Sequence, residues 1–192
     1  MKRFALLAAV LAVSLLVVLQ YALAADTWVI DDFAIDATAR PDGTLVVTEQ
    51  IQVDFRGEAH HGIFRDLYYK VPCVQPENSA TPTPVIPCPD NYDRLYDIRY
   101  TGVTDAAGKP IDYGVSDEGD YLRAKIGDPD KALTGKQTYV IHYQISGLLD
   151  GYSDHDELHW NATGTWPVGI TRASSRVVSR DVLAICAAAT SS

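Results

Sequence analysis

Positive charge is scarce in this 192-residue chain, which has 16 Lys and Arg residues against 25 Asp and Glu and a formal net charge of −9. No cluster of basic residues stands out along the sequence. Nucleic-acid phosphates and anionic lipid head groups are bound mainly by clustered Lys and Arg side chains. The composition therefore argues against a nucleic-acid partner and against electrostatic docking on an anionic membrane.

Long apolar segments are equally scarce, because only Phe4–Leu19 forms one. It follows two basic residues and leads into a small-x-small pattern that ends at Ala24. This layout predicts a secretory signal peptide over 1–24, cleaved between Ala24 and Ala25. The alternative is an uncleaved signal anchor, because the segment is only slightly shorter than the roughly 20 residues that cross a bilayer. We expect an exported chain, outside the cytoplasmic membrane, that can associate with the membrane through Met1–Ala24 only.

The three cysteines of the chain do not have the spacing of a zinc finger. Cys73 and Cys88 lie within a loop, 71–91, that holds six of the ten prolines, a density that no helix or central strand tolerates. Because exported proteins can form disulfides, we expect these two cysteines to pair and to add about 3 kcal/mol of stability through chain entropy. Cys186 has no evident partner in the sequence.

Familiar catalytic motifs are also missing, including the G-x-S-x-G elbow, the Walker loop and the dinucleotide fingerprint. One metal hypothesis remains. His155, Glu157 and His159 alternate along a predicted strand, so their side chains would share one face. Two imidazoles and a carboxylate can hold zinc and leave a position for a reactive water. The alternative interpretation is a solvated outer face, and on it we expect no metal and no other cofactor.

The stretch 156–170 holds two of the three tryptophans. Trp160 is predicted to pack in the core, whereas Trp166 is assigned neither to the core nor to a platform for a carbohydrate or peptide. Asn161 begins an Asn-Ala-Thr glycosylation sequon, which we interpret as accidental. Three nearby carboxylates suit calcium by chemistry but lack the EF-hand pattern. They belong to Asp150, Asp154 and Asp156.

Alternation of apolar and polar residues dominates the rest of the chain. It predicts a hairpin with strands at 27–40 and 44–55, and another clear strand at 137–147. About nine short strands follow one another with turns roughly every 8–12 residues, and no helix is expected after the signal segment. The fold class is therefore all-β, an immunoglobulin-like antiparallel β-sandwich over residues 25–178. Residues 179–192 are expected to be a ragged or truncated tail.

Glu49 interrupts the apolar face of the second predicted strand, and the other positions of that face are occupied by Leu, Val, Ile and Phe. A buried carboxylate is unfavourable unless it is paired and hydrogen-bonded. Arg65 lies in phase with the apolar residues of the next predicted strand, so we expect Glu49 and Arg65 to form an ion pair inside or at the edge of the sandwich. A catalytic carboxylate is the alternative role for Glu49.

Four motifs in order support a family resemblance: P-D-G-T-L-V-V-T-E, H-G-I-F-R-D, G-x-x-T-Y-x-I-x-Y and D-E-L-x-W-N-A-T-G-x-W-x-V. Together they span most of Trp28–Val178. The series resembles the amino-terminal domain of the bacterial predicted membrane proteins called domain-of-unknown-function family 2207. The resemblance implies an exported β-sandwich outside the cytoplasmic membrane, and it brings no catalytic residues.

The favoured function is a non-catalytic binding or interaction domain of the bacterial cell envelope, whose partner is an unidentified envelope protein or ligand. The first alternative is a metal-dependent hydrolase that uses His155, Glu157 and His159. The second is a truncated fragment of a longer membrane protein. Because many functions are grafted onto one sandwich fold, the fold alone does not choose among them.

Overall fold

The computed structural model describes residues 28–73, 92–152, 156–179 and 183–188, and every regular element in these ranges is a strand. The strands are β1 (Val29–Ala39), β2 (Leu45–Asp54), β3 (Ile63–Tyr68), β4 (Lys70–Pro72), β5 (Asp93–Leu95), β6 (Asp97–Thr104), β7 (Tyr113–Asp117), β8 (Tyr121–Ile126), β9 (Lys136–Ser146), β10 (Leu149–Gly151), β11 (Asp156–Asn161), β12 (Ala173–Ser179) and β13 (Leu183–Ala188). The all-β prediction is confirmed. The predicted signal segment and its cleavage site at Ala24 and Ala25 lie outside the described residues, as do Cys88 and His155.

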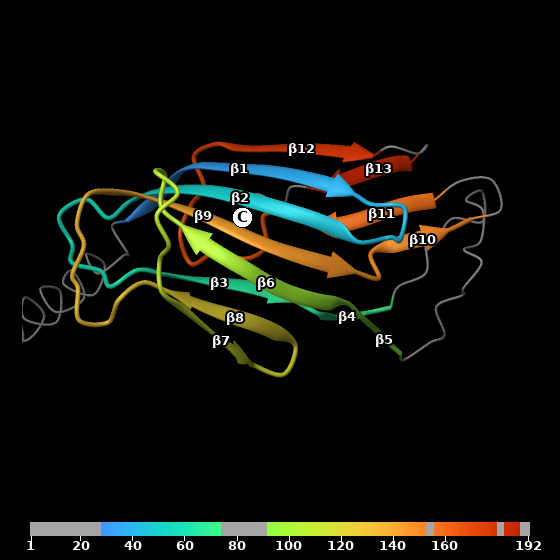
Figure 1. Ribbon diagram of the computed structural model, residues 1–192, viewed down its shortest axis with the longest axis horizontal. Helices are drawn as coiled ribbons and strands as arrows, with labels where there is room; N and C mark the ends of the chain where they lie inside the picture. The colour runs from blue at the N-terminus through green and yellow to red at the C-terminus, as the bar shows by residue number, and fades with distance from the viewer. Residues whose placement is uncertain (1–27, 74–91, 153–155, 180–182, 189–192) are drawn as a thin grey trace, which may run out of the picture.

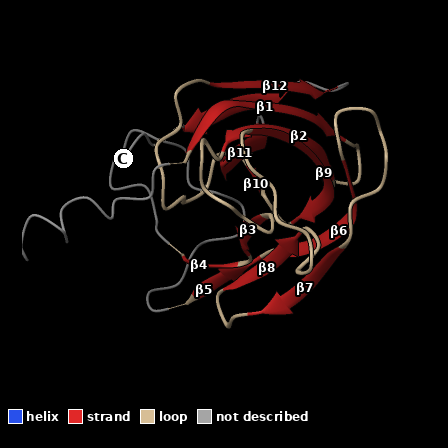
Figure 2. Cartoon of the chain, turned by 90° about the vertical axis from the view of Figure 1, so that its left-hand side faces the viewer, coloured by secondary structure: helices blue, strands red, loops and turns tan. Residues whose placement is uncertain are grey.

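One five-stranded sheet, in the order β12-β1-β2-β9-β6, forms the main layer (Figure 1). The strands that face it belong to smaller sheets, β3-β8-β7, β10-β11-β13 and β4-β5. Figure 2 shows the main sheet curving around β10 and β11, with β3, β8 and β7 on the opposite side of the barrel-like section. The facing layer is therefore divided, and the division leaves room for a pocket.

The β1–β2 hairpin shows why the alternation predicts the fold well. Phe33, Ile35 and Ala37 of β1 are almost fully buried, and so are Val47 and Ile51 of β2. Side chains on successive strand residues point to opposite faces, so one apolar face suffices to fix this register. The same rule holds in β9, where every second residue from 139 to 145 is buried, namely Tyr139, Ile141, Tyr143 and Ile145.

Two aspects of the predicted fold are wrong. The sheets are not wholly antiparallel, because β12 pairs parallel to β1 and β13 pairs parallel to β11. The described residues form thirteen strands rather than the predicted nine or so, and the additional ones are β4, β5, β10 and β13. Strands of three residues carry too little alternation to be recognised from sequence.

The predicted tail, 179–192, also needs correction, since β13 occupies Leu183–Ala188 within it. Small residues such as Ala and Ser give no period-two contrast, so a strand built from them has no sequence signature. Cys186 lies in β13 opposite His159 of β11 in the backbone register. The predicted disulfide between Cys73 and Cys88 stays a prediction, because Cys88 is not among the described residues.

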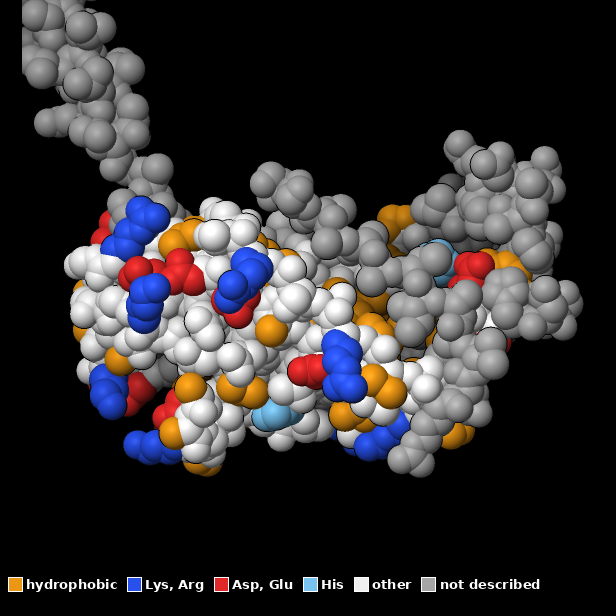
Figure 3. All heavy atoms as spheres, turned by 90° about the horizontal axis from the view of Figure 1, so that it is seen from above, with side chains coloured by type: hydrophobic (Ala, Val, Ile, Leu, Met, Phe, Trp, Pro, Cys, Tyr) orange, Lys and Arg blue, Asp and Glu red, His pale blue; other side chains and the backbone are white. Residues whose placement is uncertain are grey.

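The face of the molecule seen from the β12 side carries both charge signs next to each other (Figure 3). Arg172 contacts Asp32 at 2.7 Å and Arg176 contacts Asp36 at 3.8 Å across the β12–β1 pair. Exposed pairs of this kind contribute about 0–1 kcal/mol each. They place both charge signs side by side, so this view shows no patch of a single charge sign.

Candidate binding pocket and the buried cluster beside it

Arg65 of β3 and Glu49 of β2 form the buried ion pair that the sequence predicts. Arg65 Nε donates to Glu49 Oε2 at 2.7 Å, and Arg65 Nη2 donates to Glu49 Oε1 at 2.5 Å. The two side chains are 1% and 0% exposed. Tyr143 of β9 donates its hydroxyl to the same Oε1 at 2.5 Å. The pair thus links β3 to the centre of the main sheet.

The remaining N–H groups of Arg65 hold the loop that follows β11. Nη2 donates to the carbonyl of Ala162 at 3.1 Å, and Nη1 donates to the carbonyls of Thr163 at 3.1 Å and Asp66 at 3.2 Å. All five guanidinium N–H donors therefore have acceptors. The ring centroids of Phe33 and Trp166 each lie 5.5 Å from the guanidinium carbon, within range of a cation–π contact.

The environment of this cluster keeps Arg65 protonated and charged and keeps its tyrosines protonated and neutral. Burial lowers the pKa of Arg65, but the adjacent Glu49 carboxylate outweighs this effect and raises it overall. Burial and then the Glu49 charge raise the pKa of Tyr143 well above its usual range. Burial likewise raises the pKa of Tyr100, whose hydroxyl donates to the Arg65 carbonyl at 2.9 Å. Glu49 is enclosed by its partners and out of reach of a substrate, which argues against the catalytic alternative and for a structural role.

Two buried tyrosines on β9 allow a matched test of this network. Tyr143 bonds Glu49, whereas the buried hydroxyl of Tyr139 has no hydrogen-bond partner among the described residues. We expect Tyr143→Phe to lower the free energy of unfolding by about 1.5–3 kcal/mol, the contribution of a hydrogen bond to a charged group. Tyr139→Phe is expected to change it by less than about 0.5 kcal/mol, because no bond is lost. Urea unfolding of both variants measures these changes. Equal losses of unfolding free energy in the two variants would contradict a stabilising Tyr143–Glu49 bond.

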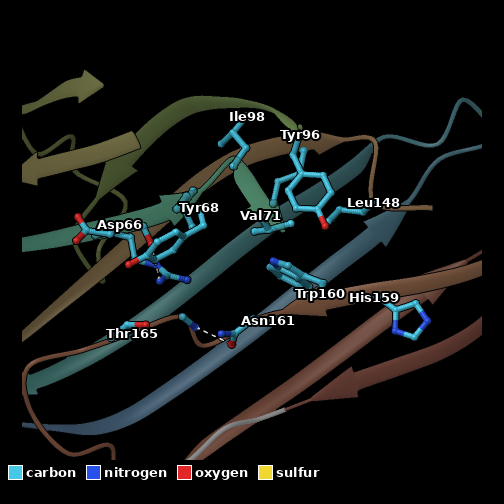
Figure 4. Close-up of a pocket in the computed structure, with 14 residues that line it drawn as sticks. Asp66, Tyr68, Val71, Tyr96, Ile98, Leu148, His159, Trp160, Asn161 and Thr165 are labelled. Atoms are coloured by element: carbon cyan, nitrogen blue, oxygen red, sulfur yellow. Dashed lines mark hydrogen bonds between the residues drawn. The ribbon is translucent and has the colours of Figure 1, made fainter. Parts of the chain in front are cut away.

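Beside this cluster lies a pocket of about 540 Å³ between the divided sheets of the facing layer. β3 and β4 form one wall, β11 and the loop after it form the other, and β6 and β9 lie beneath. Its lining residues are Arg65, Asp66, Leu67, Tyr68, Val71, Tyr96, Ile98, Ile145, Leu148, His159, Trp160, Asn161, Gly164 and Thr165. Figure 4 shows Tyr68, Tyr96 and Trp160 around a common space, with Asp66 and His159 toward its two ends.

Neighbouring bonds fix the aromatic wall. Tyr96 donates its backbone N–H to the Tyr69 carbonyl at 2.7 Å, and the guanidinium of Arg94 lies 5.6 Å from its ring centroid. Arg94 in turn contacts Asp150 at 2.7 Å and donates to the Gly147 carbonyl. Tyr96 is therefore held directly by Tyr69, between β3 and β4, and by Arg94 of β5, and Arg94 is itself fixed by the turn before β10.

Residues 29–182 match the N-terminal domain of the predicted membrane proteins of family DUF2207. The chain belongs to this family. A relative of the DUF2207 chain, the uncharacterized protein YciQ of Escherichia coli, is 31% identical over 144 residues. The match covers 72% of this chain, which spans only about a fifth of the length of YciQ, 20%. No helix that is long and apolar enough to cross a membrane occurs among the described residues.

Solved structures resemble the DUF2207 chain only distantly. An M1 zinc metallopeptidase from Deinococcus radiodurans has a TM-score of 0.37 at 10% identity, with 62% of this chain and 20% of the peptidase covered. Native yeast LTA4 hydrolase has a TM-score of 0.39 at 10% identity, with 61% and 14% covered. Values this low carry no inference about activity.

The structure brings only part of the hypothetical zinc trio into view. His159 Nε2 lies 2.8 Å from Glu157 Oε2, as expected for side chains on one face of β11, and His155 lies outside the described residues. No group of three or more potential metal ligands forms among the residues that the structure describes. Of the calcium candidates, Asp150 is paired with Arg94 and Asp154 is not described. The metal hypothesis remains a prediction that elemental analysis can test.

The two tryptophans Trp160 and Trp166 of the DUF2207 domain lie in different environments from those predicted. Trp160 only partly enters the core and lines the pocket, so its assignment to the core is wrong in part. Trp166 packs beside Arg65 and donates Nε1 to the Thr163 carbonyl at 2.8 Å. Sequence reasoning missed Tyr68 and Tyr96 as pocket residues. The one sequence feature that marks these two tyrosines is their size, because the strand pattern predicts exposed or strand-end positions for them.

Proposed function

We propose that this chain is a non-catalytic binding domain presented outside the cytoplasmic membrane, and that the pocket is its binding site. The observation that carries the proposal is the aromatic pocket itself. Its volume lies within the range of roughly 300–1,000 Å³ that is usual for ligand sites, and most of its lining is apolar with a few polar groups. Membership of a family of predicted membrane proteins is consistent with this location.

The chemistry around the pocket supports binding over catalysis. Arg65 is saturated by Glu49 and three carbonyls, and Asp66 is held by Arg123 through two bonds of 2.8 and 2.7 Å. A general acid or base must be able to exchange a proton with a substrate in the site. Two of the charged groups at this pocket are committed to structural partners instead. The hydrolase alternative depends on His155, Glu157 and His159, and stoichiometric zinc in the purified chain would favour it.

Narrowing the pocket tests the proposal. Val71 lines the pocket, and Val178 lies on β12, is 38% exposed and is not part of the lining. A ligand present at 100 times its Kd adds about 2.7 kcal/mol of stability, or roughly 5–10 °C in Tm for a domain of this size. We therefore expect ligands found by thermal-shift screening to raise Tm in the wild type and in Val178→Trp. The shift should disappear in Val71→Trp, whose indole occupies the pocket.

The screen should cover saccharides, peptides and amphiphiles at neutral pH. Circular dichroism of both variants without ligand checks that each is folded. A ligand that stabilises Val71→Trp as strongly as the wild type binds elsewhere, and this result would contradict the assignment of the pocket. A screen in which no compound shifts Tm in the wild type would contradict the binding function as a whole.

A further inference from the structure

The pocket offers no unpaired charge to a ligand, although one Arg, one Asp and one His side chain line it. Arg65 is paired with Glu49, Asp66 with Arg123, and His159 with Glu157 at 2.8 Å. Recognition of an anion requires a cation with donors to spare, and recognition of a cation is strongest beside an unpaired carboxylate. Neither is present among the described residues of the lining. The charge pattern therefore favours an electrically neutral ligand.

The polar groups that remain available are neutral and of both kinds. The hydroxyls of Tyr68 and Tyr96, the indole N–H of Trp160 and the Nδ2 of Asn161 make no hydrogen bond to another described residue. The Oδ1 of Asn161 accepts from the Gly164 N–H at 3.1 Å, which turns Nδ2 away from that bond as a donor. Two of these groups donate only, and the hydroxyls both donate and accept. A ligand must supply acceptors and donors close together.

From these groups we propose that the pocket binds a neutral saccharide. This inference rests on the proposed binding function and names its ligand class. Each sugar hydroxyl can both donate and accept a hydrogen bond, and the C–H faces of a pyranose ring are apolar enough to pack on aromatic rings. The pocket combines three such rings with neutral hydrogen-bonding groups. A cationic ligand fits less well, because the Trp160 and Asn161 donors would point their hydrogens at it.

An extended peptide, the main rival, would use the edge of β3. β3 is the outer strand of its sheet, and peptides commonly add to such edges through main-chain bonds. Here Arg65 holds the carbonyls of Ala162 and Thr163 against β3 and also occupies the Asp66 carbonyl. That part of the edge is closed by the chain itself, so the aromatic rings rather than the strand edge are what a ligand can use.

The test is calorimetric titration of the full chain with neutral tetrasaccharides of N-acetylglucosamine, glucose and galactose. Tetraglucosamine, which has the same backbone as the first but is cationic, serves as the matched ligand. At least one neutral tetrasaccharide should bind with a Kd below roughly 1 mM, a free energy near −4.1 kcal/mol. Its affinity should not change between low and high salt, because no charge pair is formed. Tetraglucosamine should bind more weakly.

Three variants locate the contact. Trp160→Ala should weaken binding by about tenfold, since an aromatic contact and its buried area are lost. Tyr92→Ala removes a 65% exposed tyrosine outside the pocket and should leave the affinity unchanged. Asn161→Asp keeps the Oδ1 acceptor for Gly164 but replaces the Nδ2 donor by a negative charge. It should weaken binding of the neutral sugar several-fold, whereas a cationic ligand would bind it more tightly.

The failures of the two proposals can be told apart. If no neutral tetrasaccharide binds the wild type, or if Trp160→Ala binds as well as Tyr92→Ala, the saccharide inference is overturned. If a peptide or a charged compound then binds the wild type and not Val71→Trp, the pocket is still a binding site for another class. If no class binds in a manner that Val71→Trp abolishes, both proposals fail.

Discussion

Replacing Arg65 by Met is expected to lower the free energy of unfolding by about 3–5 kcal/mol, which is the usual loss when one partner of a buried ion pair is removed. Glu49 would stay buried without its counter-charge, and the carbonyls of Ala162 and Thr163 would lose their donors. The matched control is Arg123→Met. Arg123 pairs with Asp66 at the surface, so its loss should be less than about 1 kcal/mol.

Urea unfolding at neutral pH measures both changes. The double variant Glu49→Leu with Arg65→Met should lose less stability than Arg65→Met alone, because no charge is then left buried without a partner. It should not return to the wild-type value, since the loop carbonyls remain without donors. If Arg65→Met and Arg123→Met lose the same small amount, the Glu49–Arg65 pair does not contribute as its burial indicates.

Gly164→Ala is expected to have the second-largest effect, a loss of about 2–4 kcal/mol. Gly164 has φ of +69°, where an L side chain costs about 1–2 kcal/mol. A Cβ at this position would also lie 2.4 Å from Arg65 Nη1. The guanidinium cannot move aside without losing hydrogen bonds to charged or buried partners, each of which contributes roughly 0.5–3 kcal/mol.

Gly135→Ala is the control that measures the cost of a side chain at positive φ without a steric contact. Gly135 has a similar φ of +64°, and a Cβ there would meet no atom within 4 Å. Gly164→Ala should therefore be less stable than Gly135→Ala by about 1 kcal/mol or more, measured by urea unfolding. Combined with Arg65→Met, the Gly164 penalty should fall to that of Gly135, because coupled sites are not additive. An unchanged penalty would place the cause outside the Arg65 contact.

Local sequence patterns are sufficient to predict those features of the fold that involve only one strand and its immediate neighbour. Glu49 stood out because a carboxylate on an apolar strand face needs a partner, and Arg65 was the charged residue in phase on the next strand. The β1–β2 hairpin follows in the same way from the alternation in its two strands. In these cases one period-two pattern decides which face is buried, so sequence alone is sufficient.

What sequence could not predict depends on contacts between distant segments. The carbonyls of Ala162 and Thr163 bind Arg65 from 97 and 98 positions away, and a backbone carbonyl has no residue signature. The pocket exists because the layer facing the main sheet is divided, which no single strand reveals. The parallel pairing of β12 and β13 is similar, since strand direction follows from the path of the chain and not from residue pattern.

The separation of these segments along the chain has a consequence for the order in which the domain forms. Arg65 reaches Glu49 16 positions earlier in the chain, but the loop carbonyls that accept from Arg65 and the Tyr143 hydroxyl that donates to Glu49 come from the last third of the described sequence. Contacts between distant residues form slowly because long loops must close first. We therefore expect the charge on Arg65 to stay hydrated until residues 162–164 are in place, and the pocket wall to form late in folding.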